Sequence, residues 1–192
     1  MEKMLKVGVM PGRIQEVAVN TGMTLKEVIA LAGLDANGNW TPEAMQRAIA
    51  CLARFKEILA DYAIDSVRVV ATNTIRIAKN AADFLPAAEA AIGLPIEVIS
   101  GEEEGRLIYL GVSNALAIPA ERRLVIDIGG GSTEIILGRG HEILKVESFA
   151  MGTVKHSSNF FPQGVISEEG FDAAVLTVRS LLEDATPAYQ PE

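Results

Sequence analysis

Apolar residues recur at helical spacing between residues 41 and 62, and this stretch begins with a recognisable helix start. Thr41 can accept hydrogen bonds from the free N–H groups of a first turn, and Pro42 has the φ angle which that turn requires. A helix is therefore predicted from Pro42 to about Tyr62. Its apolar stripe consists of Met45, Ile49, Leu52, Phe55 and Leu59.

Strand-like and helix-like patterns alternate between residues 66 and 113. The segments 66–72 and 95–100 are short, apolar and β-branched, which is typical of buried strands. A helix is predicted to begin at Asn80, with Asp83 in its first turn, and another runs from Glu102 to about Ser113. This alternation predicts a parallel sheet of the α/β class.

After Pro119 the pattern changes to short strands joined by tight turns. These strands are expected at 124–128, 133–138 and 141–151, as a meander of hairpins. A new subdomain is therefore expected to begin near residue 120. Ser167 is expected to open a final amphipathic helix, and the tail 186–192 to be frayed.

The N-terminal segment has a pattern of its own. Residues 4–19 read as two short strands around a turn at Pro11 and Gly12, and Thr24 opens a short helix. The chain is accordingly divided into 1–33, 34–119 and 120–192.

Composition narrows the class of protein. Apolar residues make up 49% and charged residues 22% of the 192 residues, as in an ordinary globular protein. The net charge of −8 argues against nucleic-acid and anionic-membrane partners. No apolar run reaches the roughly 20 residues that span a bilayer. A single cysteine, Cys51, allows no internal disulfide and fits a reducing cytoplasm.

The segment 127–134, DIGGGSTE, is the first candidate for chemistry. Its glycines let backbone N–H groups approach an anion, and Ser132 and Thr133 add hydroxyl donors. A hairpin folding at the glycines would bring Asp127 and Glu134 to one divalent cation, and Mg²⁺ suits two carboxylates with phosphate oxygens. The alternative is a plain glycine-rich turn.

The segment 100–104, SGEEE, is the second candidate. Ser100 and Glu103 have the spacing of a capping box, and acidic residues suit the first turn of a helix. Glu104 has no such structural assignment. Repulsion between adjacent carboxylates suits it to accept a proton as a general base, but the residues alone leave both interpretations open.

Arg76 follows a predicted strand of the parallel sheet, where binding crevices form. Its guanidinium can grip a phosphate with two hydrogen bonds, but it can equally be a surface residue beside a turn. His141 and His156 lack metal-ligand spacing and are expected to be surface or core residues.

Four segments carry a family resemblance: RVVATNTIRIAKNAADFL (68–85), IEVISGEEEGRLIYLGV (96–112), LVIDIGGGSTEIILG (124–138) and ESFAMGTV (147–154). In this order and spacing they resemble the exopolyphosphatase / guanosine pentaphosphate phosphohydrolase family. The resemblance implies the actin-like ATPase (ribonuclease H-like) architecture, with a cleft between two related α/β domains. It also implies Mg²⁺-dependent release of the terminal phosphate from polyphosphate or guanosine pentaphosphate.

The resemblance assigns roles to particular residues. Glu104 corresponds to the glutamate that activates the attacking water, and Arg76 to the arginine of the cleft. Asp127 and Glu134 correspond to the metal-associated carboxylates. The phosphate-binding loop corresponds to Gly129, Gly130, Gly131, Ser132 and Thr133.

Some features depart from the family pattern. The opening phosphate loop, Asp-x-Gly-Ser-Asn-Ser, is not found, and residues 1–33 resemble the start of a small β-grasp protein. The chain stops soon after the expected start of the second domain. Gly105 and Thr153 stand where the family usually has alanine and cysteine. The missing loop and the shortened second domain imply a poor catalyst, and the shortened domain leaves apolar sheet surface uncovered, which favours a homodimer. The changes at Gly105 and Thr153 are small.

Two other functions compete with phosphoanhydride hydrolysis. Loops of the DIGGGS type also serve kinases of the same superfamily, although the SGEEE segment favours attack by water. A truncated or chimeric domain that folds without catalysing, and keeps only an anion site, is the non-enzymatic alternative.

Overall fold

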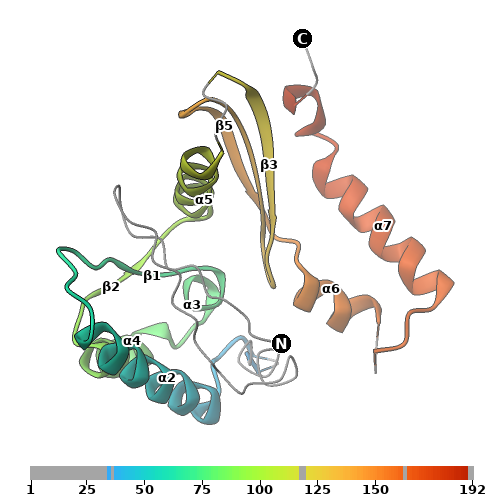
Figure 1. Ribbon diagram of the computed structural model, residues 1–192. Coiled ribbons are helices and arrows are strands. Elements are labelled where there is room, and N and C mark those ends of the chain that lie inside the picture. The colour runs from blue at the N-terminus through green and yellow to red at the C-terminus, as the bar shows by residue number, and fades with distance from the viewer. Residues whose placement is uncertain (1–33, 36, 117–119, 162–163, 190–192) are drawn as a thin grey trace. The chain divides into compact units, whose positions relative to one another are not determined.

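The computed structural model describes residues 34–35, 37–116, 120–161 and 164–189 (Figure 1). The predicted hairpin at 4–19 and helix from Thr24 lie outside these residues. The chain forms two compact units that divide between Val98 and Ile99, and each is described by itself.

The first unit is a small α/β arrangement in which β1 and β2 pair in parallel. The prediction of parallel pairing is therefore confirmed. Thr41 caps α2 as predicted, because its side chain accepts a 3.3 Å hydrogen bond from the N–H of Ala44. The elements are α2 (Pro42–Ala60), β1 (Val69–Ala71), α3 (Asn73–Ile77), α4 (Ala81–Ile92) and β2 (Ile96–Val98).

The core of the first unit forms where α2 and α4 pack together. The rings of Trp40 and Phe84 meet edge to face with centroids 4.4 Å apart, beside the fully buried Ala44 and Ala88. Asn80 is the residue before α4, as predicted, but its side chain makes no capping hydrogen bond. Its side chain instead accepts from the N–H of Trp40 (2.8 Å) and donates to the Trp40 carbonyl (3.0 Å).

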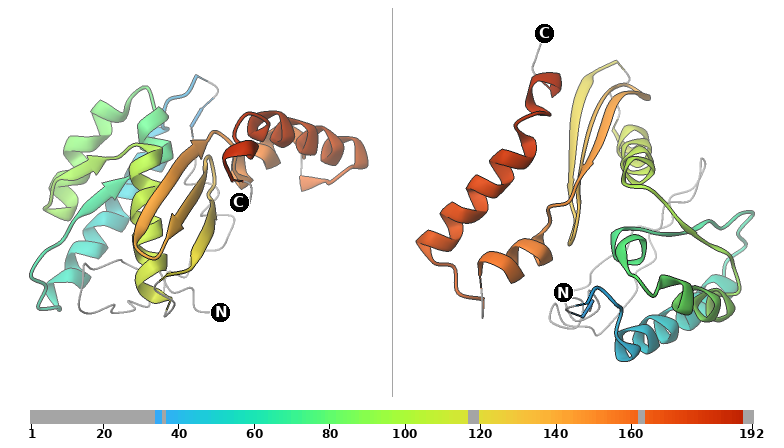
Figure 2. Two further views of the ribbon diagram at one scale, coloured as in Figure 1. Left: turned by 90° about the horizontal axis from the view of Figure 1, so that it is seen from above. Right: turned by 180° about the vertical axis from the view of Figure 1, so that it is seen from behind.

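The second unit is built on an antiparallel sheet in the order β3-β4-β5. Figure 1 and Figure 2 show α5 on one side of this sheet and α7 on the other. The predicted meander is therefore confirmed, and α7 begins after the cap Ser167 as expected. The elements are α5 (Gly101–Ala115), β3 (Arg122–Ile128), β4 (Thr133–Arg139), β5 (Glu142–Phe149), α6 (Thr153–Phe160), α7 (Glu168–Leu182) and the 3-10 turn η2 (Thr186–Tyr189).

Helix α5 packs closely on strands β4 and β5. Tyr109 is fully buried, and its hydroxyl donates a 3.0 Å hydrogen bond to the carbonyl of Gly140. Gly138 leaves space for the Tyr109 ring, since a Cβ there would overlap the ring. This packing explains why the second unit begins at Ile99, earlier than the subdomain start expected near residue 120.

Burial differs from the sequence prediction in the two strands of the first unit, which were expected to be buried. Val70 of β1 is 38% exposed and Val98 of β2 is 41% exposed. Strand β3 alternates in exposure, as an edge strand with one covered face does. Apolar content alone did not distinguish a fully buried strand from one covered on a single face.

The predicted frayed tail is also wrong for residues 186–189, which form η2. Helices α3 and α6 were not predicted, because each is short and lacks a long apolar stripe. In the part of the chain that the structure describes, no helix is long and apolar enough to cross a membrane.

Candidate active site

Asp127, Glu134 and Ser148 form a row across the second unit's sheet. Asp127 of β3 pairs with Glu134 of β4, which pairs with Ser148 of β5. Directly paired residues of antiparallel strands point to the same face, with Cβ atoms about 4.5–5.5 Å apart. The structure therefore brings together the two carboxylates that the sequence predicted to act jointly.

A β-bulge sets the third member of this row. The pairing register of β4 and β5 changes by one residue between Leu137 and Gly138, so that Gly138 pairs with Ile143. If that pairing continued without the bulge, Glu147 rather than Ser148 would lie opposite Glu134. Because of the bulge, the hydroxyl of Ser148 lies opposite Glu134, where otherwise a second carboxylate would lie.

Glu134 is only 1% exposed, which is unusual for a carboxylate. Its Oε1 accepts a 2.7 Å hydrogen bond from the hydroxyl of Ser148. Its Oε2 is buried and has no hydrogen-bond partner among the described residues. A buried carboxylate oxygen without a partner is costly, and a cation is one way to remove that cost. These residues fit a divalent cation held with Asp127, although the described residues contain no cluster of three or more His, Cys, Asp or Glu side chains with metal-binding geometry.

Helix α5 covers this row from one side, and Gly105 makes the close contact possible. A Cβ at Gly105 would lie 2.6 Å from Cγ2 of Val146, 3.2 Å from Cγ1 of Ile136 and 3.5 Å from Cβ of Glu134. Glu104 directly precedes Gly105 in α5 and is half-buried. The candidate general base therefore lies on the helix turn that rests against the candidate metal ligand.

The start of α5 agrees with the capping prediction. Ser100 accepts a 3.1 Å hydrogen bond from the N–H of Glu103, and the N–H of Glu104 donates to the Ser100 carbonyl at 3.0 Å. Glu103 also pairs with Arg106 through two hydrogen bonds of 2.6 and 2.9 Å. Glu103 is thus engaged in structural contacts at the start of the helix.

The glycine loop 129–132 is held by the start of α6. The N–H groups of Thr153 and Val154 donate to the carbonyls of Gly129 and Gly130, both at 2.9 Å. Gly152 packs so closely that a Cβ there would lie 2.5 Å from the Gly130 carbonyl oxygen. Within the loop the N–H of Gly129 donates to the Ser132 carbonyl at 2.9 Å, so this N–H is not available to the anion that the sequence predicted. The N–H groups of Gly130 and Gly131 are the loop's remaining candidates for an anion.

The two hydroxyls predicted to bind phosphate are both buried, Ser132 at 4% and Thr133 at 3% exposure. Thr133 donates its hydroxyl proton to the carbonyl of Met151 over 2.9 Å. That proton cannot reach a ligand at the same time, so the hydroxyl of Thr133 anchors the segment after β5. The glycine backbone remains the part of the loop suited to an anion.

The other candidate residues are not part of this row. Arg76 lies in the last turn of α3, in the first unit, so the structure does not place it relative to the carboxylates. His141 contacts the hydroxyl of Ser113 at 3.2 Å, and the Nδ1 of His156 lies 3.1 Å from the Gly152 carbonyl. Both histidines therefore have structural contacts, as expected.

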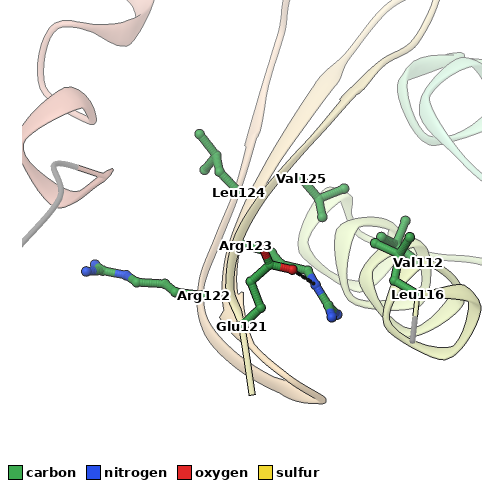
Figure 3. Close-up of a pocket in the computed structure, with 7 residues that line it drawn as sticks. All are labelled: Val112, Leu116, Glu121, Arg122, Arg123, Leu124 and Val125. Atoms are coloured by element: carbon green, nitrogen blue, oxygen red, sulfur yellow. Dashed lines mark hydrogen bonds and ion pairs between the residues drawn. The ribbon is translucent and has the colours of Figure 1, made fainter. Parts of the chain in front are cut away.

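A separate hollow of about 500 Å³ lies at the other end of β3 (Figure 3). In this view Arg123 and Val125 point toward α5, whereas Arg122 and Leu124 point away from it. None of the predicted site residues lines this hollow. Its lining residues are Val112, Leu116, Glu121, Arg122, Arg123, Leu124 and Val125.

Sequence reasoning did not single out Ser148 or the close contact of Gly152. Ser148 carried no signal of its own, because its partner is known only once the register and its bulge are fixed. Gly152 follows a predicted strand, but a glycine at that place does not by itself reveal which segment packs against it. The structure shows that Gly152 packs directly on the glycine loop.

The sequence matches the Ppx/GppA phosphatase family over residues 16–192. The match begins inside the segment 1–33, which resembled a β-grasp start. Because it covers most of the chain, the chain belongs to the Ppx/GppA phosphatase family.

Solved structures of similar proteins show the same fold. An exopolyphosphatase-like protein is 29% identical, with a TM-score of 0.76, over 82% of this chain and 50% of that chain. An exopolyphosphatase from Cytophaga hutchinsonii is 29% identical, with a TM-score of 0.73, over 92% of this chain and 54% of that one. The Ppx/GppA family member of Aquifex aeolicus is 32% identical, with a TM-score of 0.66, over 82% of this chain and 51% of that chain. This chain therefore spans about half the length of these relatives. The likeness to their structures confirms the predicted α/β fold class.

Proposed function

We propose that this chain contributes the catalytic carboxylates of a phosphoanhydride hydrolase. The substrate is inorganic polyphosphate or guanosine pentaphosphate, from which water releases the terminal phosphate. The observation that carries the proposal is the buried Glu134, which lies opposite Asp127 and packs against the helix turn that holds Glu104. Family membership supports phosphate release over other reactions at such a site.

Each residue has a distinct task in this proposal. Glu104 accepts a proton from the attacking water, and the P–O–P bond breaks as the new P–O bond forms. The backbone N–H groups of Gly130 and Gly131 bind the phosphate oxygens. Arg76 is proposed to bind phosphate through its guanidinium. Asp127 and Glu134 would hold Mg²⁺, which supplies charge neutralisation for the phosphate oxygens when it is bound.

The exposed apolar side chains of β3 support a homodimer as part of the same proposal. Leu124, Ile126 and Ile128 are 50%, 54% and 65% exposed and lie on the face away from Asp127. Among the described residues β3 is an edge strand of its sheet. A second copy of the chain that covers this row would remove apolar surface from water.

The test is phosphate release from long-chain polyphosphate and from guanosine pentaphosphate, each with and without Mg²⁺. We expect Mg²⁺-dependent release from at least one substrate and a large loss in Asp127→Asn. Asp172→Asn is the matched control, because Asp172 is an exposed acid of α7. Release that needs no Mg²⁺, or that is equal in wild type and Asp127→Asn, would contradict the proposed site. Absence of release from either substrate would support the non-catalytic alternative.

A further inference from the structure

The hydrogen bond from Ser148 to Glu134 joins two strands through side chains on the face that α5 covers. A serine hydroxyl has one proton to donate, and here it is given to Oε1 over 2.7 Å. Buried polar pairs of this kind fix the orientation of both side chains, because every other orientation loses the bond.

The two oxygens of Glu134 are therefore not equivalent. Oε1 is engaged by Ser148, while Oε2 is buried and lacks a hydrogen-bond partner in the described part of the chain. Asp127 lies directly across the neighbouring strand pair, on the side of Glu134 away from Ser148. The row thus has a donor at one end, a carboxylate at the other, and a carboxylate oxygen without a partner between them.

From this asymmetry we infer that Ser148 is a positioning residue for the divalent cation, acting through Glu134. It holds Oε1 so that Oε2 stays available for a cation shared with Asp127. This inference rests on the proposed function, since it concerns the metal of that site. Residues that orient a metal ligand in this way typically alter metal affinity by about 10–100-fold when they are removed.

The β-bulge between Leu137 and Gly138 makes the inference specific to Ser148. Without the bulge Glu147 would lie opposite Glu134, and two carboxylates would repel where a hydroxyl now donates. Glu147 instead takes part in contacts with Lys145 and Tyr189. The register therefore selects a hydrogen-bond donor for this position.

The experiment measures Mg²⁺ binding to the whole chain by calorimetry in the presence of inorganic phosphate. We expect Ser148→Ala to weaken Mg²⁺ binding by about tenfold or more, and Ser148→Thr, which keeps the hydroxyl, to restore most of it. Ser158→Ala is the matched control, because Ser158 is exposed on α6. Glu134→Gln should lose Mg²⁺ binding almost entirely.

A second readout separates positioning from mere structural support. At a fixed Mg²⁺ concentration, tighter binding to the folded chain gives a larger rise in melting temperature. A positioning role predicts a smaller Mg²⁺-induced rise in Ser148→Ala than in wild type. If Ser148→Ala lowers the melting temperature but keeps the full rise, Ser148 only supports the fold and the inference is overturned.

The outcomes also distinguish this inference from the proposed function. If wild type and Ser148→Ala bind Mg²⁺ equally while Glu134→Gln does not bind, the metal site stands and the role of Ser148 is wrong. If wild type does not bind Mg²⁺, or Glu134→Gln binds as well as wild type, the metal site at Glu134 and the role of Ser148 both fail.

Discussion

The hydroxyl of Tyr189 donates a 2.7 Å hydrogen bond to a carboxylate oxygen of Glu147, and so ties η2 to strand β5. The same hydroxyl lies 3.3 Å from the carbonyl of Ile135, and Lys145 lies over the tyrosine ring with its Nζ 5.0 Å from the centroid. Burial raises the pKa of Tyr189, and the bond to Glu147 raises it further, so this hydroxyl keeps its proton at neutral pH.

This contact predicts a pH dependence of stability. Burial alone would raise the pKa of Glu147, but the hydrogen bonds from Lys145 and Tyr189 outweigh it and the net pKa is lowered. A carboxylate with a lowered folded-state pKa stabilises the fold above its unfolded pKa and loses that contribution as the pH falls. Denaturant titrations of the wild type from pH 7 to pH 3 should show the free energy of unfolding falling below about pH 4.5. Part of that fall should be absent in Glu147→Gln. The same pH profile for both proteins would contradict this assignment.

Gly105 predicts an unusual response to alanine in a helix. Alanine normally stabilises a helix by about 1 kcal/mol relative to glycine. Here the new Cβ would lie 2.6 Å from Val146, so we expect Gly105→Ala to destabilise by about 1–3 kcal/mol. Denaturant unfolding followed by circular dichroism measures the change.

The same helix offers the control. A Cβ at Gly111 would have no neighbour within 4 Å, so Gly111→Ala should be neutral or stabilising by up to about 1 kcal/mol. Val146→Ala should relieve much of the cost of Gly105→Ala, since it removes the atom that the new Cβ meets. Equal stability of the two glycine variants would mean that α5 shifts freely on the sheet.

Glu104 is predicted to be the general base. Glu104→Gln should lower the rate of phosphate release by about a hundredfold or more, while substrate affinity changes little. Glu102→Gln serves as the control, because Glu102 is an exposed acid of the same helix turn. Steady-state kinetics on the substrate that the wild type hydrolyses would decide, and near-normal turnover in Glu104→Gln would remove Glu104 from that role.

The exposed row on β3 predicts self-association. Sedimentation velocity should show a dimer for the wild type and a shift toward monomer for Ile126→Lys, because a charge would then lie in the apolar contact. Leu144→Lys, at an exposed position of β5 instead of β3, is the comparison variant. A wild type that remains monomeric at all concentrations would rule out this surface as a homodimer contact.

Local patterns predicted the elements that have strong local signals. Thr41 and Ser100 cap α2 and α5 as expected, because a capping side chain bonds to the backbone of its own first turn. The juxtaposition of Asp127 and Glu134 was also predictable, since one short glycine turn joins their strands.

Long-range partners account for what the sequence did not reveal. The sequence places Asn80 at the start of a helix, but its side chain bonds to the backbone of Trp40, which lies 40 residues away. Ser148 meets Glu134 only because a bulge changes the register by one residue. Neither contact can be predicted from the local sequence pattern, because each depends on a partner residue far away in the sequence.

Trp40 is the only tryptophan in the sequence. Its backbone N–H bonds to Asn80, and its ring meets that of Phe84 edge to face. Its fluorescence therefore reports the environment of the first unit alone, whereas the carboxylate row lies in the second. Circular dichroism, by contrast, senses helices of both units. If the two signals change at different denaturant concentrations, the two units unfold separately, and the chain carries its own optical label for telling them apart.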